Sequence, residues 1–180
     1  MDGSSPRTVA TRLAPIMRLV LDALRAGISV SGDVHARQGW NPSADRHTQH
    51  ALVRREAMER LKPAGAYLED GDNLGLPMSG LILRSAAGDV VRVWHSEDGE
   101  LPLATTRPLR QFFTQQPTWQ AALFPAEPAD SGGRGSSNLA LLWDDDGSHI
   151  TRFDLVRPYG LDGKRALIDW QLDVLREPNT

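Results

Sequence analysis

The first residues that could do chemistry are His47 and His50, which lie three positions apart in a segment with a helical pattern. Imidazoles one helical turn apart can reach the same metal ion. A tetrahedral site needs further ligands, which His35 or Glu56 would supply only if tertiary folding brought them near. The sequence contains neither an HExxH motif nor a cysteine. We therefore expect ordinary helix histidines and no bound metal or cofactor, with His47 and His50 as the candidates if a metal does bind.

The run Asp144-Asp145-Asp146-Gly147 resembles the first residues of a calcium-binding loop. Such a loop needs further oxygen ligands at defined spacing and a terminal acid. Ser148, His149 and Ile150 follow instead. Asp and Gly are common turn residues, so the run predicts a solvated turn between two strands.

Two further carboxylates, those of Asp154 and Asp169, fall on neighbouring predicted strands, with Lys164 or His149 as a nearby base. Two carboxylates and a base on adjacent strands can bind a magnesium ion and activate water. The acid-x-Lys pair that such sites commonly use is absent, because Gln171 stands two positions after Asp169. We expect no catalytic residue here, and a small metal-dependent hydrolase or nuclease is the alternative function.

Composition excludes several other classes. The chain of 180 residues has no cysteine, which rules out disulfides, cysteine-ligated metal sites and a cysteine nucleophile. Nucleophile elbows, phosphate-binding glycine loops and dinucleotide fingerprints are absent as well. No apolar run approaches the ~18 residues needed to cross a bilayer, and the N-terminus lacks the features of a signal peptide. We therefore expect a cytoplasmic protein with no membrane contact.

Charge is unevenly distributed along the chain. Residues 1–66 hold ten Arg and Lys against six Asp and Glu, whereas residues 67–180 hold ten against seventeen, which together give the net charge of −3. A basic helical region ahead of an acidic region can mark a surface for a partner. The net charge does not favour nucleic-acid binding. A helix-turn-helix motif also fails, because the gap between Gly27 and Asn41 is too long.

These observations favour a non-catalytic interaction or regulatory protein that uses a protein-binding surface on its basic N-terminal region. Tryptophan and arginine dominate binding hot spots. The candidate contact residues are Trp40, Arg46, Arg54 and Arg60, and the expected partner is a protein, with acidic proteins as the candidates. A nucleic-acid-linked regulator is the second alternative function.

The segments that must position these residues begin with two helices. Ser5-Pro6 predicts a helix start, and apolar residues at three- and four-residue steps predict a helix over 5–26 that ends at Gly27. Residues 27–41 predict a loop. A second helix runs from Asn41-Pro42 to Lys62, with a buried stripe that His47 and Arg54 interrupt; the stripe comprises Ala44, Ala51, Met58 and Leu61.

From residue 75 onward the pattern predicts strands. We expect strands over 78–84, 90–95, 100–103, 138–143, 148–157 and 165–175, and a short helix over 106–116. Residues 125–137 predict a flexible loop. The fold class is therefore α+β: two N-terminal helices on a mostly antiparallel sheet of five or six strands, with a short helix between the sheet halves. The helical region 1–66 and the β-rich region 67–180 together form one compact domain.

Overall fold

The N-terminal helix is longer than its pattern predicts. The computed structural model describes residues 5–42, 44–61, 81–115 and 137–176. In it the first helix, α1, spans Pro6–Gln38. Ser5 caps it by accepting a hydrogen bond from the Thr8 N–H, and Gly39 ends it in the left-handed conformation. The predicted end at Gly27 and the predicted loop over 27–41 are therefore wrong. None of the described helices is long and apolar enough to cross a membrane.

Helix α1 passes through Gly27 because its second half is held by tertiary packing. Ile28, Ser31 and His35 are buried at three- and four-residue steps beyond Gly27. A Cβ on Gly27 would lie 2.6 Å from the Val53 carbonyl oxygen, so the glycine marks the closest approach of two helices. In the part of α1 that follows Gly27, burial against a neighbouring helix outweighs the low intrinsic helix propensity of the residues.

The second helix, α2, spans Arg46–Leu61 and turns a different face to the core than predicted. It starts after Asp45, whose carboxylate accepts a hydrogen bond from the Thr48 N–H. The residues that it buries follow four-residue steps: Gln49, Val53, Ala57 and Leu61. Of the predicted stripe only Leu61 is buried, whereas Ala44 and Ala51 are exposed.

The sheet has five strands in the order β1-β2-β3-β4-β5. They span Leu81–Arg84, Val90–His95, Asn138–Asp145, Ile150–Asp162 and Arg165–Asp173. Strands β2 and β3 are parallel and the other neighbours antiparallel, so the sheet is mixed rather than mostly antiparallel. Residues 100–103 form no strand. A local pattern identifies a strand but not its neighbour, and pairing across the long 96–137 connection is decided by the whole fold.

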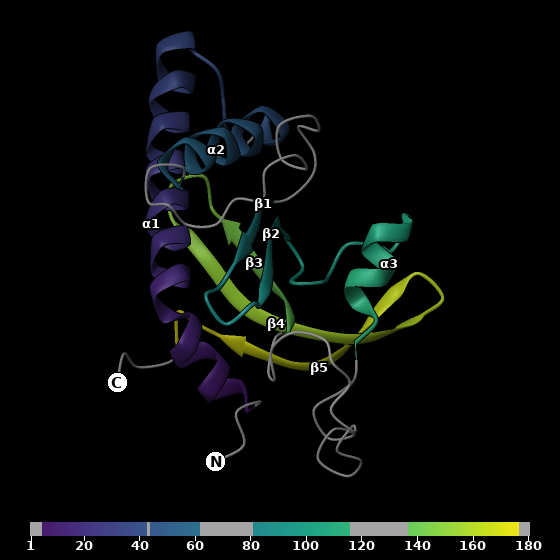
Figure 1. Cartoon of the computed structure of the whole chain (residues 1–180). Helices are drawn as coiled ribbons and strands as arrows, with labels where there is room; N and C mark the ends of the chain where they lie inside the picture. Colours follow the sequence, from purple (N-terminus) through teal and green to yellow (C-terminus); the bar gives the residue numbers. More distant parts are fainter. Residues whose placement is uncertain (1–4, 43, 62–80, 116–136, 177–180) are drawn as a thin grey trace, which may run out of the picture.

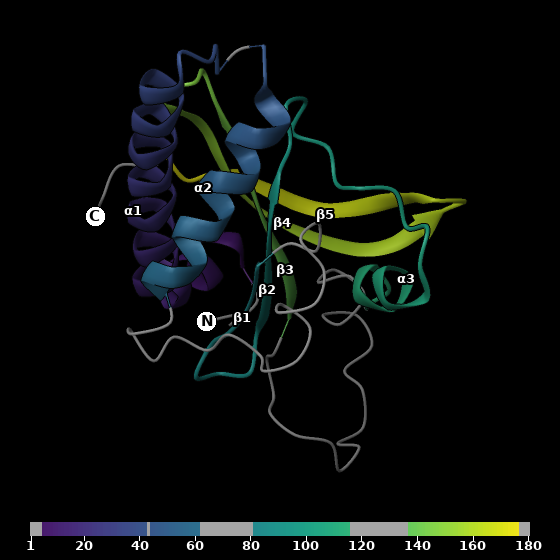
Figure 2. The same cartoon turned by 90° about the horizontal axis from the view of Figure 1, so that it is seen from above.

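Helices cover both faces of the sheet, as Figures 1 and 2 show: α1 and α2 lie on one side and α3 (Arg107–Phe113) lies on the other. Side chains alternate accordingly along the strands. On β3, Leu139 and Leu141 join the core beneath α1 and α2, whereas Ala140 and Leu142 lie in a separate cluster on the opposite face.

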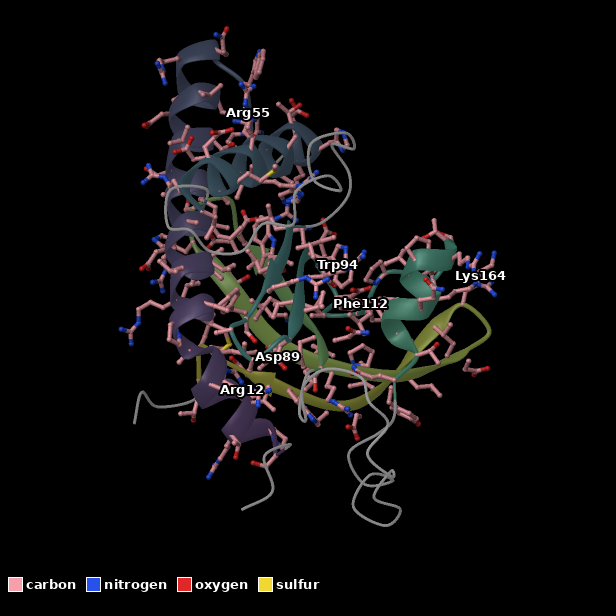
Figure 3. The ribbon with its side chains drawn as sticks, viewed as in Figure 1. Arg12, Arg55, Asp89, Trp94, Phe112 and Lys164 are labelled. Carbon is pink, nitrogen blue, oxygen red and sulfur yellow. The ribbon has the colours of Figure 1, made fainter. Side chains whose placement is uncertain are left out.

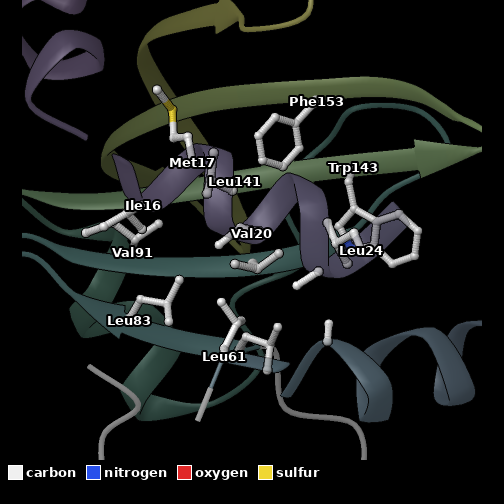
Figure 4. Packing of buried hydrophobic residues seen from close by; sticks show 14 of the residues in the cluster. Ile16, Met17, Val20, Leu24, Leu61, Leu83, Val91, Leu141, Trp143 and Phe153 are labelled. Atoms are coloured by element: carbon white, nitrogen blue, oxygen red, sulfur yellow. The ribbon is translucent and has the colours of Figure 1, made fainter. Parts of the chain in front are cut away.

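The larger core joins the two halves of the sequence. Figure 4 shows Val20 and Leu24 of α1 and Leu61 of α2 packed against Val91 and Leu141 of the sheet. On the α3 side, Phe112 and Phe113 pack with Trp94. The flexible loop predicted over 125–137 lies outside the described residues except for Ser137, and so does the start of the strand predicted over 78–84.

Candidate metal centre and adjoining cavity

Two histidines and a buried aspartate meet at one edge of the sheet. His95 ends β2 and Asp145 ends β3, and because these strands are parallel their carboxyl ends lie side by side. Helix α2 crosses the same edge and brings His50 to them. One potential metal-binding atom from each of the three residues lies within 4.8 Å of the other two.

The distances suit a single small ion. His50 Nε2 lies 3.5 Å from Asp145 Oδ2, and His95 Nε2 lies 3.9 Å from the same oxygen. Two ligands at 2.0–2.1 Å from a tetrahedral zinc ion are separated by about 3.3 Å, so the three candidate ligand atoms, which lie within 4.8 Å of one another, would have to move closer together to hold one ion. The two imidazole rings are in contact, with centroids 3.6 Å apart and their planes tilted by 32°. Trp143 packs edge-on against both rings and limits their movement.

The two carboxylate oxygens of Asp145 have different surroundings. Oδ1 accepts hydrogen bonds from Gln49 Nε2 at 2.9 Å and from the Gly147 N–H at 2.7 Å. Oδ2 is buried and, like the facing His50 Nε2, has no hydrogen-bond partner among the described residues. Buried polar atoms normally have a partner, and metal ligands are normally oriented by a second layer of hydrogen bonds. Asp145 is thus held with one oxygen directed at the two histidines.

Protonation states also suit metal binding. Burial lowers the pKa of His95, and the neighbouring His50 lowers it further, although the carboxylates of Asp144 and Asp145 oppose both effects. Burial would raise the pKa of Asp145, but its contacts with His50 and the Gly147 N–H outweigh burial and hold that pKa below its ordinary value. A neutral imidazole and an ionised carboxylate are the forms that coordinate metals.

His50 and His95 of this cluster line a cavity of about 250 Å³. One wall is a face of α2, formed by His47, His50, Ala51 and Arg54. The other wall is largely apolar and includes Leu24, Leu81, Val93 and Trp143. Burial lowers the pKa of Arg54.

Of the α2 stripe predicted to be buried, Ala51 lines this cavity, and so do His47 and Arg54, which interrupt the stripe. These three residues lie on a different side of the helix from the core residues Val53 and Ala57. His47 and Arg54 appeared to interrupt an apolar face because that face borders a cavity.

Of the histidines considered from the sequence, only His50 belongs to the cluster. His47 is exposed and lines the cavity. His35 is buried in α1 against the Ser31 carbonyl oxygen, and Glu56 pairs with Arg60. Sequence reasoning missed His95 and Asp145, because only the parallel pairing of β2 and β3 brings a strand-ending histidine beside this acidic run.

The acidic run divides between a strand and a turn. Asp144 and Asp145 belong to β3, so the predicted turn begins too early. Asp146 accepts hydrogen bonds from the N–H groups of Ser148 and His149, which closes the turn into β4. Asp144 Oδ1 lies 3.2 Å from His95 Nε2 and is therefore next to the candidate metal centre.

The four residues of the hydrolase or nuclease alternative are not brought together. Lys164 lies in the turn after β4 and His149 in the turn before it, at opposite ends of a strand of 13 residues. Asp169 pairs with Arg157, and Asp154 accepts a hydrogen bond from Gln171.

Substituting Asp154 with asparagine should flatten the pH dependence of stability. Burial raises the pKa of Asp154, so the folded chain holds this proton more tightly than the unfolded chain. The contribution to stability is therefore present below the unfolded pKa and is lost as the pH rises through the folded one. Urea unfolding of the wild type and Asp154→Asn at pH 4 and pH 7 measures how the free energy of unfolding changes with pH. The same change in both proteins would contradict a raised pKa at Asp154.

The four predicted partner-binding residues occupy different surroundings. Trp40 is 50% exposed just beyond α1. Arg46 donates to the Asp145 carbonyl oxygen and pairs with Glu97. Arg54 lines the cavity, and Arg60 is exposed beside Glu56.

Comparison with known proteins does not identify a relative of this chain. No family model matches the sequence, and neither a curated protein nor a solved structure matches the chain. Function is therefore inferred from the residues themselves.

Proposed function

We propose that this protein binds a zinc-class divalent ion through His50, His95 and Asp145, and that it is a metal-dependent hydrolase. The observation that carries the proposal is that one potential ligand atom of each of His50 and His95, which line a cavity, lies within 4.8 Å of a carboxylate oxygen of the buried Asp145. Zinc accepts nitrogen and oxygen ligands of this kind. This metal-dependent site differs from the strand-carboxylate site considered from the sequence.

A site with three protein ligands suits catalysis better than a structural role. Structural zinc sites usually have four protein ligands, whereas catalytic sites leave one position for water or substrate. A zinc ion held here would lower the pKa of a bound water and make it a nucleophile. Asp144, whose carboxylate stands beside His95, is the group positioned to accept the proton of that water.

Zinc should raise the melting temperature of the metal-free protein. At a concentration one hundred times the Kd, binding to the folded state adds about 2.7 kcal/mol, equivalent to a rise of roughly 5–10 °C for a chain of this size. His50→Ala, His95→Ala and Asp145→Asn should abolish the rise. Asparagine at position 145 keeps an oxygen that can accept the hydrogen bonds from Gln49 and the Gly147 N–H. This variant therefore removes the charged metal ligand and keeps the hydrogen bonds that hold the side chain.

His149→Ala is the matched control, because His149 is an exposed histidine on the adjacent turn. It should keep the full response to zinc. An equal zinc response in the wild type and all three ligand variants would overturn the proposed centre. The reaction class is then tested with p-nitrophenyl acetate and bis-p-nitrophenyl phosphate as substrates. Their hydrolysis should be lost with a chelator and restored by zinc.

We propose a protein-binding surface around Trp40 as a second function. Its support is the exposure of half of this large side chain at the end of α1, next to His35. Trp40→Ala should leave the melting temperature almost unchanged and weaken binding of an acidic partner protein. Leu103→Ala, at a similarly exposed apolar position, is the control.

A further inference from the structure

The cavity that His50 and His95 line has an apolar wall whose shape is fixed by the core. This wall includes four nearly inaccessible side chains, those of Leu24, Leu81, Val93 and Trp143. All four belong to the large hydrophobic cluster between the sheet and the two N-terminal helices. Packed core side chains hold defined positions. An apolar group can therefore bind against this wall without first ordering it.

The size of the cavity sets the size of that group. Its volume is about 250 Å³. An apolar cavity of about 150 Å³ in another protein is large enough to hold benzene. The space beside His50 and His95 therefore accommodates a group the size of a phenyl ring or a short acyl chain, and it is too small for a long chain.

The polar residues of the cavity favour an uncharged group over an ion. Among the described lining residues none is acidic, and Arg54, the one arginine or lysine in this set, already makes an interaction within the protein. Taking an ion out of water without a partner is costly. The other titratable lining residues are histidines, which in the neutral form can donate a hydrogen bond to a carbonyl oxygen.

We propose that the substrate of the hydrolase is an uncharged ester of a small apolar carboxylic acid, whose acyl part packs against Leu24, Val93 and Trp143. In the reaction the oxygen of water bonds to the acyl carbon, the bond to the alcohol oxygen breaks, and the alcohol leaves with a proton from the water. The inference rests on the proposed function for this reaction. Binding of the acyl part needs only the cavity, so the two proposals can fail separately.

Binding to the metal-free protein is measured by calorimetry with benzamide and benzoate, which have similar shapes and differ in charge. Benzamide should bind at least ten-fold more tightly than benzoate. Ala51→Phe should abolish benzamide binding, because Ala51 is exposed at the cavity wall and the ring can fill the cavity without displacing the core. Ala36→Phe is the matched control, since Ala36 is exposed in α1 and is not among the lining residues.

The zinc-loaded protein is then tested with esters of different acyl length. p-Nitrophenyl butyrate has two more methylenes than the acetate, and each buried methylene is worth about a four-fold effect. Its kcat/KM should therefore be roughly ten- to twenty-fold higher. Ala51→Phe should remove this preference and keep the rise in melting temperature with zinc.

Three results would overturn the proposal. They are benzoate binding as tight as that of benzamide, benzamide binding that Ala51→Phe leaves unchanged, and equal kcat/KM for the acetate and the butyrate. Absence of a zinc response, with benzamide binding still lost in Ala51→Phe and kept in Ala36→Phe, would refute the metal centre and support the site for the acyl part.

Discussion

Replacing Gly27 with alanine should lower the free energy of unfolding by about 3 kcal/mol, at the upper end of typical overpacking costs. The added Cβ would lie 2.6 Å from the Val53 carbonyl oxygen and 3.0 Å from the Val53 Cα. Both are backbone atoms of α2, so no side-chain rotation can relieve the clash. The helices must separate, and the core between them must open.

Gly32→Ala is the matched control, since Gly32 lies in the same helix and a Cβ added there would meet nothing within 4 Å. Alanine is the better helix former, so this change should stabilise the protein by about 0.5–1 kcal/mol. Urea unfolding measures both variants. Equal stability of Gly27→Ala and the wild type would show that α1 and α2 do not cross this closely.

The same substitution should also weaken zinc binding. Helix α2 carries His50, whereas His95 and Asp145 belong to the sheet. A shift of α2 away from α1 would misalign one ligand relative to the other two. The melting-temperature rise with zinc should therefore be smaller in Gly27→Ala than in Gly32→Ala.

The second large effect is expected at Asp89, whose side chain is completely buried and accepts four hydrogen bonds. Arg12 of α1 donates two, from Nε to Oδ2 at 3.1 Å and from Nη2 to Oδ1 at 2.9 Å. The Ser85 hydroxyl donates at 2.8 Å and the Ser137 N–H at 2.9 Å. Figure 3 shows Arg12 and Asp89 on neighbouring elements. This carboxylate therefore joins α1, the β1–β2 turn and the start of β3.

Asp89→Ala should destabilise the protein by about 3 kcal/mol, the lower end of the range for breaking a buried ion pair, because Arg12 retains some solvent contact. Asp22→Ala is the control, since Asp22 forms only an exposed pair with Arg25 at 3.7 Å and should contribute less than about 0.5 kcal/mol. Denaturant unfolding compares the two. A cost at Asp89 no larger than that at Asp22 would refute the proposed role.

Local signals in the sequence determined several elements correctly. The stripe Leu13, Ile16 and Val20 predicted the first half of α1, and the run over 90–95 coincides with β2. Gly88 and Gly147 have positive φ in the turns that join β1 to β2 and β3 to β4, where a residue without a Cβ is favoured. Each of these features depends on contacts between near neighbours in the chain.

Tertiary structure decided the features that depend on distant partners. Gly27 resembled a helix end, yet it is the point where α1 needs no side chain because α2 passes against it. The face of α2 that borders the core could not be separated from the face that borders the cavity, because both have apolar residues. The candidate metal centre joins His50, His95 and Asp145, and the last two meet only because β2 and β3 pair in parallel across a connection of more than forty residues. Hydrophobic periodicity records which side of a segment is buried, but it carries no information about which distant segment covers that side.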